Sequence, residues 1–176
     1  GNDHVAIADA KRGDIGNTGL HYANAFFNHF NCDAITVSPY MGEESIEPFI
    51  SNASKGAYVL CRTSNISSTF IQKDIFSKVI SLCDALNKQQ NIGLVVGATN
   101  DDVLMKVRNS TDLPFLIPGI GAQGGDLQSV LKINEKNMDT TLINVSRGII
   151  FSGNKDHDSI RNSAKQYLNQ IRGLNG

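Results

Sequence analysis

The chain has 176 residues, of which 40% are hydrophobic and 19% charged, so it is long enough to bury the core of one domain. Its 16 basic and 17 acidic side chains leave a net charge of −1, which gives no global field for binding nucleic acid or an anionic membrane. No apolar run approaches the roughly 20 residues that span a bilayer, and the N-terminus resembles neither a secretory signal nor a transit segment.

Strand-like runs alternate with amphipathic helical segments from one end of the chain to the other. The predicted strands are His4–Ala10, Ala34–Tyr40, Ala57–Ser64, Ile92–Thr99, Phe115–Gly121 and Thr141–Ile150. The predicted helices are Leu20–Phe30, Ile71–Asn87, Asp101–Arg108, Leu127–Asn134 and Ser159–Gly173. Several strand runs are almost continuously apolar, which is typical of parallel strands buried on both faces. The alternation, without any hairpin signal, predicts an α/β fold.

Most of the unusual residues follow the predicted strands, and chemistry at the C-terminal ends of parallel strands is typical of a (β/α)₈ TIM barrel. An open doubly wound sheet also binds ligands there and remains an alternative. A complete barrel has eight strands and about 250 residues, whereas this chain shows six such runs. We therefore expect residues 1–176 to form a single barrel domain covering about strands 3–8, with the N-terminal strands 1–2 missing.

Charged residues of both signs follow the first predicted strand. If that strand continues to Lys11, Asp9 and Lys11 project to one face, because side chains alternate along a strand. Asp14 then adds a second carboxylate from the loop. A solvated loop is the alternative, since an exposed ion pair contributes only about 0–1 kcal/mol. As a functional motif, the row predicts a site that neutralises or repels a substrate carboxylate.

A glycine-rich turn follows the fifth predicted strand, over Pro118–Asp126. Glycines let the backbone approach an anion closely, and successive N–H groups and a helix N-terminus favour negative charge. Arg147 lies in the segment that ends the next predicted strand, and its guanidinium can hold a phosphate with two hydrogen bonds. An ordinary turn and a surface arginine are the alternatives. Barrel enzymes often bind phosphate after strands 7 and 8, so the pair predicts a substrate with a phosphate tail.

The same loops carry a resemblance to a known family. The motifs are Asp9–Thr18 (DAKRGDIGNT), Pro39–Gly42 (PYMG), Cys61–Asn65 (CRTSN), Pro118–Gly125 (PGIGAQGG) and Asn144–Gly148 (NVSRG). In this order they closely resemble the orotidine 5'-monophosphate decarboxylases. A bare D-x-K-x-x-D motif also occurs in sugar-phosphate decarboxylases of the same suprafamily, so the GNT, TSN and GAQGG extensions distinguish the two.

The resemblance implies a homodimer of barrels with shared active sites. Asp9 and Lys11 are then catalytic in one site, while Asp14, also catalytic, reaches the partner's site with Ile15 and Thr18. The other implied substrate-binding residues are Thr63, Ser64, Pro118, Gln123, Ser146 and Arg147. A further Lys and Asp of the family lie on its first two strands and have no counterpart here.

The expected function is cofactor-free conversion of orotidine 5'-monophosphate (OMP) to uridine 5'-monophosphate (UMP) and CO₂ in pyrimidine biosynthesis, with Lys11 protonating a C6 carbanion. The alternatives are a sugar-phosphate decarboxylase or aldolase and a non-catalytic nucleotide-binding fragment. We expect no metal, because the four histidines are scattered. The three cysteines lack metal-ligand spacing and indicate free thiols in a reducing compartment, so we expect a cytoplasmic protein without nucleic-acid or membrane partners.

Overall fold

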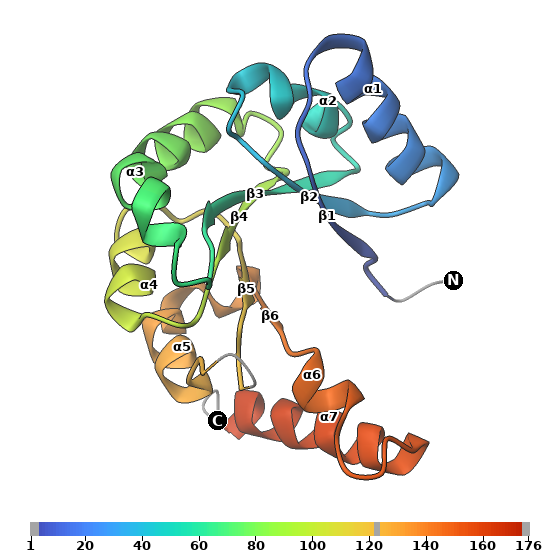
Figure 1. Cartoon of the computed structure of the whole chain (residues 1–176), viewed down its shortest axis with the longest axis vertical. Coiled ribbons are helices and arrows are strands. Elements are labelled where there is room, and N and C mark those ends of the chain that lie inside the picture. The colour runs from blue at the N-terminus through green and yellow to red at the C-terminus, as the bar shows by residue number, and fades with distance from the viewer. Residues whose placement is uncertain (1–3, 122–123, 174–176) are drawn as a thin grey trace.

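Six parallel strands form one sheet, and their order in the sheet is their order along the chain. The computed structural model describes residues 4–121 and 124–173. The strands are β1 (Ile7–Arg12), β2 (Ala34–Val37), β3 (Gly56–Arg62), β4 (Ile92–Val96), β5 (Phe115–Pro118) and β6 (Thr141–Asn144). The sheet curls into a half-barrel with β1 and β6 at its edges (Figure 1). An open doubly wound sheet would reverse its strand order at a switch point, so that alternative is wrong.

Helices α1 to α5 lie outside the curl of the sheet, whereas α6 and α7 lie beyond β6 at one end (Figure 1). The α-helices are α1 (Gly16–Asn24), α2 (Glu47–Ile50), α3 (Ser68–Leu86), α4 (Asp101–Arg108), α5 (Leu127–Ile133), α6 (Arg147–Ile150) and α7 (His157–Gly173). Shorter helical segments are the π-helical η1 (Ala25–His29) and the 3₁₀ segments η2 (Glu43–Ser45) and η3 (Glu135–Thr140). Among the described residues, no helix combines the length and the apolarity that a membrane span requires.

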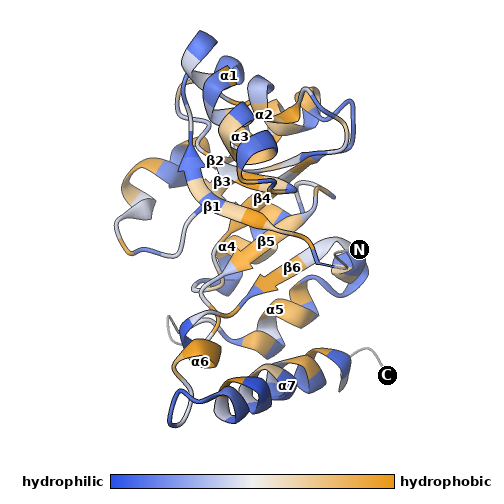
Figure 2. Cartoon of the chain, turned by 90° about the vertical axis from the view of Figure 1, so that its right-hand side faces the viewer, coloured by the Kyte–Doolittle hydropathy of each residue, from blue (hydrophilic) through white to orange (hydrophobic). Residues whose placement is uncertain are grey.

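The hydrophobic core lies between the strands and the outer helices. Val37 and Val59 from the sheet belong to the same buried cluster as Phe49 of α2 and Leu104 of α4. Figure 2 shows that the middle strands are strongly apolar, whereas α7 is mostly polar. On the opposite, concave face of the sheet, the described residues form no helical layer (Figure 1).

All six predicted strands are present, but the C-terminal end of each differs from the prediction, and two of these differences affect the site. β1 continues to Arg12, so the condition for Asp9 and Lys11 to meet is fulfilled. The strand predicted over Thr141–Ile150 ends at Asn144, and Arg147–Ile150 forms the short helix α6 instead. The two isoleucines of that segment suggested a strand, although its backbone turns directly after Val145.

A buried arginine fixes the start of β5, the strand that leads to the glycine-rich loop. The Arg108 side chain at the end of α4 donates from Nε to Asn134 Oδ1 (3.0 Å) and from Nη1 to the Leu113 carbonyl oxygen (3.1 Å). Its guanidinium carbon lies 3.4 Å from the centroid of the Phe115 ring. Burial lowers the pKa of Arg108 to about 10, with Asp112 opposing the shift. The side chain remains a cation at neutral pH and joins α4, α5 and β5.

Replacing Arg108 by methionine should lower the free energy of unfolding by about 3 kcal/mol, because it leaves buried acceptors without donors and removes the stacked cation. Chemical denaturation followed by circular dichroism measures this change. Arg161→Met on the exposed side of α7 is the matched control and should shift stability by less than about 0.5 kcal/mol. Equal effects of the two substitutions would contradict the role given to Arg108.

Candidate active site

A cavity of about 720 Å³ opens on the concave face of the sheet. Its polar wall comes from the C-terminal ends of the strands and its apolar floor from the strands themselves. The polar residues that line it are Asp9, Lys11, Thr63, Ser64, Asn65, Asn144 and Ser146. Pro118, Val5 and apolar residues of β1, β4, β5 and β6 complete the lining. Of the residues predicted for the site, the cavity therefore brings together Asp9, Lys11, Thr63, Ser64, Pro118 and Ser146.

The end of β1 departs from regular strand geometry at Lys11. Ala8 pairs with Ile35 of β2, and Arg12 pairs with Val37. Between these two pairs the chain advances by four residues in β1 and by only two in β2, so β1 contains a bulge. Lys11 has a φ of 50°, in the left-handed region that side chains other than glycine rarely adopt. Because of this bulge, the segment between Ala8 and Arg12 stands away from the regular ladder, towards the cavity.

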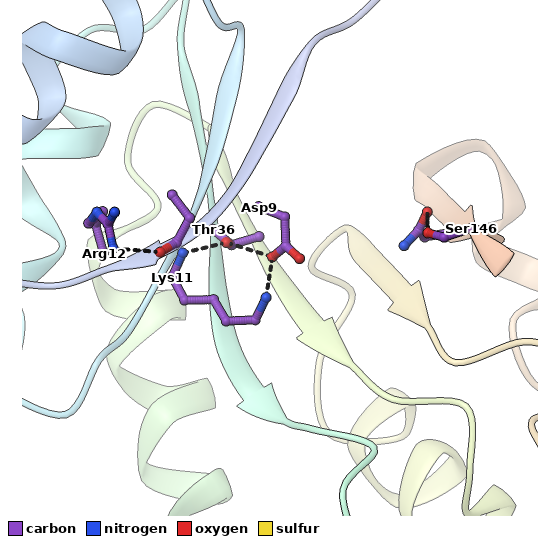
Figure 3. Close-up of polar contacts among 7 residues, drawn as sticks. Asp9, Lys11, Arg12, Thr36 and Ser146 are labelled. Atoms are coloured by element: carbon purple, nitrogen blue, oxygen red, sulfur yellow. Dashed lines mark hydrogen bonds and ion pairs between the residues drawn. The ribbon is translucent and has the colours of Figure 1, made fainter. Parts of the chain in front are cut away.

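Asp9 and Lys11 meet as the sequence predicts. Lys11 Nζ lies 2.6 Å from Asp9 Oδ1, and both side chains remain about half-exposed or more (50% and 66%). The same carboxylate oxygen accepts a hydrogen bond from Thr36 Oγ1 at 3.0 Å, and Thr36 Oγ1 accepts from the Lys11 backbone N–H at 2.9 Å. Figure 3 shows the three residues joined in this way. Sequence reasoning missed Thr36, whose only signal is a hydroxyl in an otherwise apolar strand.

The remaining residues of the first motif point elsewhere. Arg12 donates to the Ala10 carbonyl oxygen (3.1 Å) and stacks on Tyr22 of α1. The Asp14 carboxylate accepts from the backbone N–H of Ile15 at 2.9 Å. Asp14, Ile15 and Thr18 do not line the cavity that contains Lys11. Of the five motif residues predicted for the site, Asp9 and Lys11 thus lie at this cavity and the other three lie outside it.

The loop after β3 is held in shape by Gln72 of α3. Gln72 Oε1 accepts from the Thr63 backbone N–H at 2.8 Å, and its Nε2 donates to Thr63 Oγ1 at 2.9 Å. The Ser64 backbone packs against Gly97 after β4, where an added Cβ would lie 2.8 Å from the Ser64 nitrogen. Glycine at position 97 therefore allows the loop with Thr63 and Ser64 to close over the cavity edge.

The glycine-rich turn after β5 is compact. Gly119 and Gly121 have φ values of 101° and 71°, and the Gly125 backbone N–H donates to the Gly119 carbonyl oxygen at 3.0 Å. Asp126 caps α5 by accepting from the backbone N–H groups of Gln128 and Ser129, and the Ser129 bonds lower its pKa. This cap already occupies two first-turn amides of the helix. These two amides therefore already have an acceptor, and anion binding by the glycine-rich turn stays a prediction.

Two of the residues predicted to hold phosphate, Ser146 and Arg147, lie at the β6 end. Ser146 lines the cavity and lies apart from Asp9 and Lys11, as Figure 3 shows. Arg147 is exposed and begins α6, outside the cavity lining. The Tyr167 hydroxyl of α7 lies against both Gly121 and Gly148, 2.9 and 2.7 Å from where a Cβ on each would be. Gln123 lies outside the described residues.

Among the described residues, the cavity has charged acid–base groups but no cysteine that could bind a metal ion. Cys61 and Cys83 are buried free thiols, and burial raises the pKa of each to about 12. Within residues 4–121 and 124–173, no three His, Cys, Asp or Glu side chains gather closely enough to hold a metal ion. The arrangement presents an ammonium and a carboxylate at one end of the cavity, and hydroxyl and amide groups at the other.

Comparisons with known proteins agree with this geometry. The sequence profile of the orotidine 5'-phosphate decarboxylase / HUMPS family matches residues 1–159. The chain is 44% identical to the orotidine 5'-phosphate decarboxylase of Dehalococcoides mccartyi strain CBDB1 over 95% of this chain and 67% of the relative. It is 45% identical to that of Natronomonas pharaonis over 84% of this chain and 57% of the relative.

A solved structure, that of Leishmania donovani OMP decarboxylase, has a TM-score of 0.85 and 37% identity to this chain, covering 96% of this chain and 67% of the other. The barrel class predicted from the strand ends is thereby confirmed. The profile match, the identities and the curled parallel sheet all lead to one assignment: this chain belongs to the orotidine 5'-phosphate decarboxylase / HUMPS family.

Proposed function

We propose that this chain decarboxylates OMP to UMP and CO₂, using Lys11 as the group that meets the developing charge. The observation that carries the proposal is the Lys11 ammonium, held 2.6 Å from Asp9 at the mouth of a cavity of about 720 Å³. A D-x-K-x-x-D motif also occurs in sugar-phosphate decarboxylases, but the relatives that are 44 and 45% identical are both orotidine 5'-phosphate decarboxylases. Their identity favours the pyrimidine nucleotide as substrate.

Loss of CO₂ from C6 of the pyrimidine leaves an electron pair on that carbon with little delocalisation, so the barrier without catalysis is high. An ammonium fixed beside C6 stabilises this charge before and during bond cleavage, and preorganised charge of this kind commonly contributes more to catalysis than any other effect. Lys11 then transfers a proton to C6, which completes UMP. No electron acceptor or metal is needed, because the electron pair stays on the ring carbon.

Asp9 has two tasks in this scheme. It orients the ammonium through the contact at Oδ1, and its negative charge lies close to where the substrate carboxylate must enter. Conversion of that carboxylate to neutral CO₂ relieves the repulsion, which lowers the barrier relative to the bound substrate.

The phosphate of the substrate lies, in this proposal, at the β6 end, with Ser146, Arg147 and Gln123 as donors. Ser64 and Thr63 face the pyrimidine edge, and Pro118 lies beside the base. Ser146 supports this division, because it lines the same cavity apart from the Asp9–Lys11 pair (Figure 3). Binding energy from the phosphate can then be used to position the ring at Lys11.

We also propose that the working enzyme is a homodimer of complete barrels. β1 and β6 are the open edges of the described sheet, and the chain spans 67% of the Dehalococcoides relative, so two further β/α units would close the barrel between these strands. Asp14, Ile15 and Thr18 lie outside this chain's cavity, which supports their assignment to the partner's site.

In the full-length protein that contains this chain, Lys11→Ala should reduce kcat for OMP by on the order of 10⁴-fold, because it removes both the fixed cation and the proton donor. Conversion of OMP, followed by the absorbance difference between OMP and UMP, measures the effect. Lys88→Ala, an exposed lysine in the α3–β4 turn, is the control and should retain full activity. Retention of turnover in Lys11→Ala would refute the assignment.

Shared sites predict complementation between two inactive variants. Lys11→Ala and Asp14→Ala proteins, each nearly inactive alone, should regain about a quarter of the wild-type activity after co-refolding, because each mixed dimer has one intact site. The measurement is the specific activity against the mixing ratio. Absence of any recovery, with mixed dimers demonstrated by mass spectrometry, would show that Asp14 serves its own chain.

Arg147→Ala should weaken UMP binding by about 10–100-fold, since a hydrogen bond to a charged group contributes about 1.5–3 kcal/mol. Binding of uridine, which has no phosphate, should change by less than about twofold. Isothermal titration calorimetry with the two ligands separates these effects. A similar loss for both ligands would place Arg147 at the base or ribose rather than at the phosphate.

A further inference from the structure

We propose that Thr36 of β2 is a positioning residue that sets the conformation of Lys11 and the placement of the Asp9 carboxylate. The inference rests on the proposed function, in which Lys11 and Asp9 form the reacting end of the site. It adds a residue of a different strand, which none of the recognised motifs contains. The role follows from the burial of Thr36, the strand register and the balance of hydrogen-bond donors and acceptors.

Thr36 stands opposite the bulge of β1. The register passes from Ala8–Ile35 directly to Arg12–Val37, so Thr36 is the single β2 residue that faces the displaced segment. Its side chain is completely buried (0% exposed). The neighbouring Ile35 and Val37 belong to the hydrophobic core, whereas the Thr36 hydroxyl is directed to Asp9 and Lys11 (Figure 3).

The hydroxyl has one proton, and the contacts determine where that proton goes. Thr36 Oγ1 accepts from the Lys11 backbone N–H at 2.9 Å, so it acts there through a lone pair. Its own proton then goes to Asp9 Oδ1 at 3.0 Å, since a carboxylate can only accept. Lys11 Nζ donates to the same oxygen at 2.6 Å. The backbone and the side-chain ends of Lys11 are thus linked through Thr36 and Asp9.

Each of these contacts has a separate effect on the ammonium. The hydroxyl satisfies a backbone N–H that the bulge has removed from the strand ladder, which helps to hold Lys11 at a φ of 50°. The bond to Asp9 restricts the carboxylate that in turn orients Nζ. Because Thr36 touches only the reacting end and does not line the cavity, its loss should affect the chemical step and leave ligand binding nearly unchanged.

The test compares Thr36→Val and Thr36→Ser in the full-length protein. Valine keeps the shape and removes the hydroxyl, and kcat for OMP should fall about 10²-fold, the usual cost of a misplacement near 1 Å. KM for OMP and Kd for UMP should change by less than about threefold, because the network does not reach the phosphate end. Serine retains the hydroxyl and should restore kcat to within about tenfold of wild type.

Thr141→Val is the matched control. Thr141 is also buried, begins β6 at the opposite end of the sheet, and donates from its hydroxyl to the Asn137 carbonyl oxygen at 2.8 Å. This variant loses a comparable hydrogen bond away from the site, so its kcat should remain within about twofold of wild type. An equal fall of kcat in Thr141→Val, or a Thr36→Ser variant as defective as Thr36→Val, would overturn the proposal.

Hydrogen exchange provides a readout that does not depend on turnover. The Lys11 amide should be protected in the wild type and exchange at least about tenfold faster in Thr36→Val, because its acceptor is lost. Thr36→Ala serves the same purpose if the valine variant does not fold. Unchanged exchange would refute the role of Thr36 even if the wild type decarboxylates OMP. If the wild type does not decarboxylate OMP, the proposed function is refuted. The exchange rate of the Lys11 amide would then still decide whether Thr36 holds the Lys11 backbone.

Discussion

One carboxylate oxygen, Asp9 Oδ1, organises the reacting end of the cavity. It receives the Lys11 ammonium at 2.6 Å and the Thr36 hydroxyl at 3.0 Å, and through Thr36 it is connected to the Lys11 backbone. With both ionic side chains at least half-exposed, the pair contributes little to folding, about 0–1 kcal/mol. Its contribution lies in the direction of the ammonium, which a decarboxylase needs fixed before the substrate arrives.

The two ends of the cavity are built by different means. At β1, a bulge and a buried hydroxyl aim charged side chains inward. After β5 and β6, the Tyr167 hydroxyl lies against Gly121 of the glycine-rich turn and against Gly148 in α6. Asp126 accepts hydrogen bonds from two first-turn amides of α5, so these amides already have a partner within the chain.

Much of this arrangement could be predicted from the sequence, because period-two and helical patterns are local. The six strands, the pairing of Asp9 with Lys11, the barrel class and the family are all confirmed. The sequence pattern predicts a strand over Arg147–Ile150 where the structure has a helix, since the isoleucines suit either structure and only tertiary packing decides. Thr36 escaped prediction because its partners are more than 20 residues away and a threonine is ordinary in a strand. The roles assigned to Asp14, Ile15 and Thr18 stay predictions, because these residues do not line the cavity that contains Lys11.

The left-handed backbone of Lys11 has an evolutionary consequence. A residue with a side chain held at a φ of 50° raises the energy of the native state by about 1–2 kcal/mol, whereas glycine would adopt this conformation without strain. At position 11, stability therefore favours glycine, whereas the reaction requires lysine. Lineages that no longer need the reaction should lose Lys11 early, and a glycine there in a related sequence would mark a barrel that has kept its fold and abandoned its chemistry.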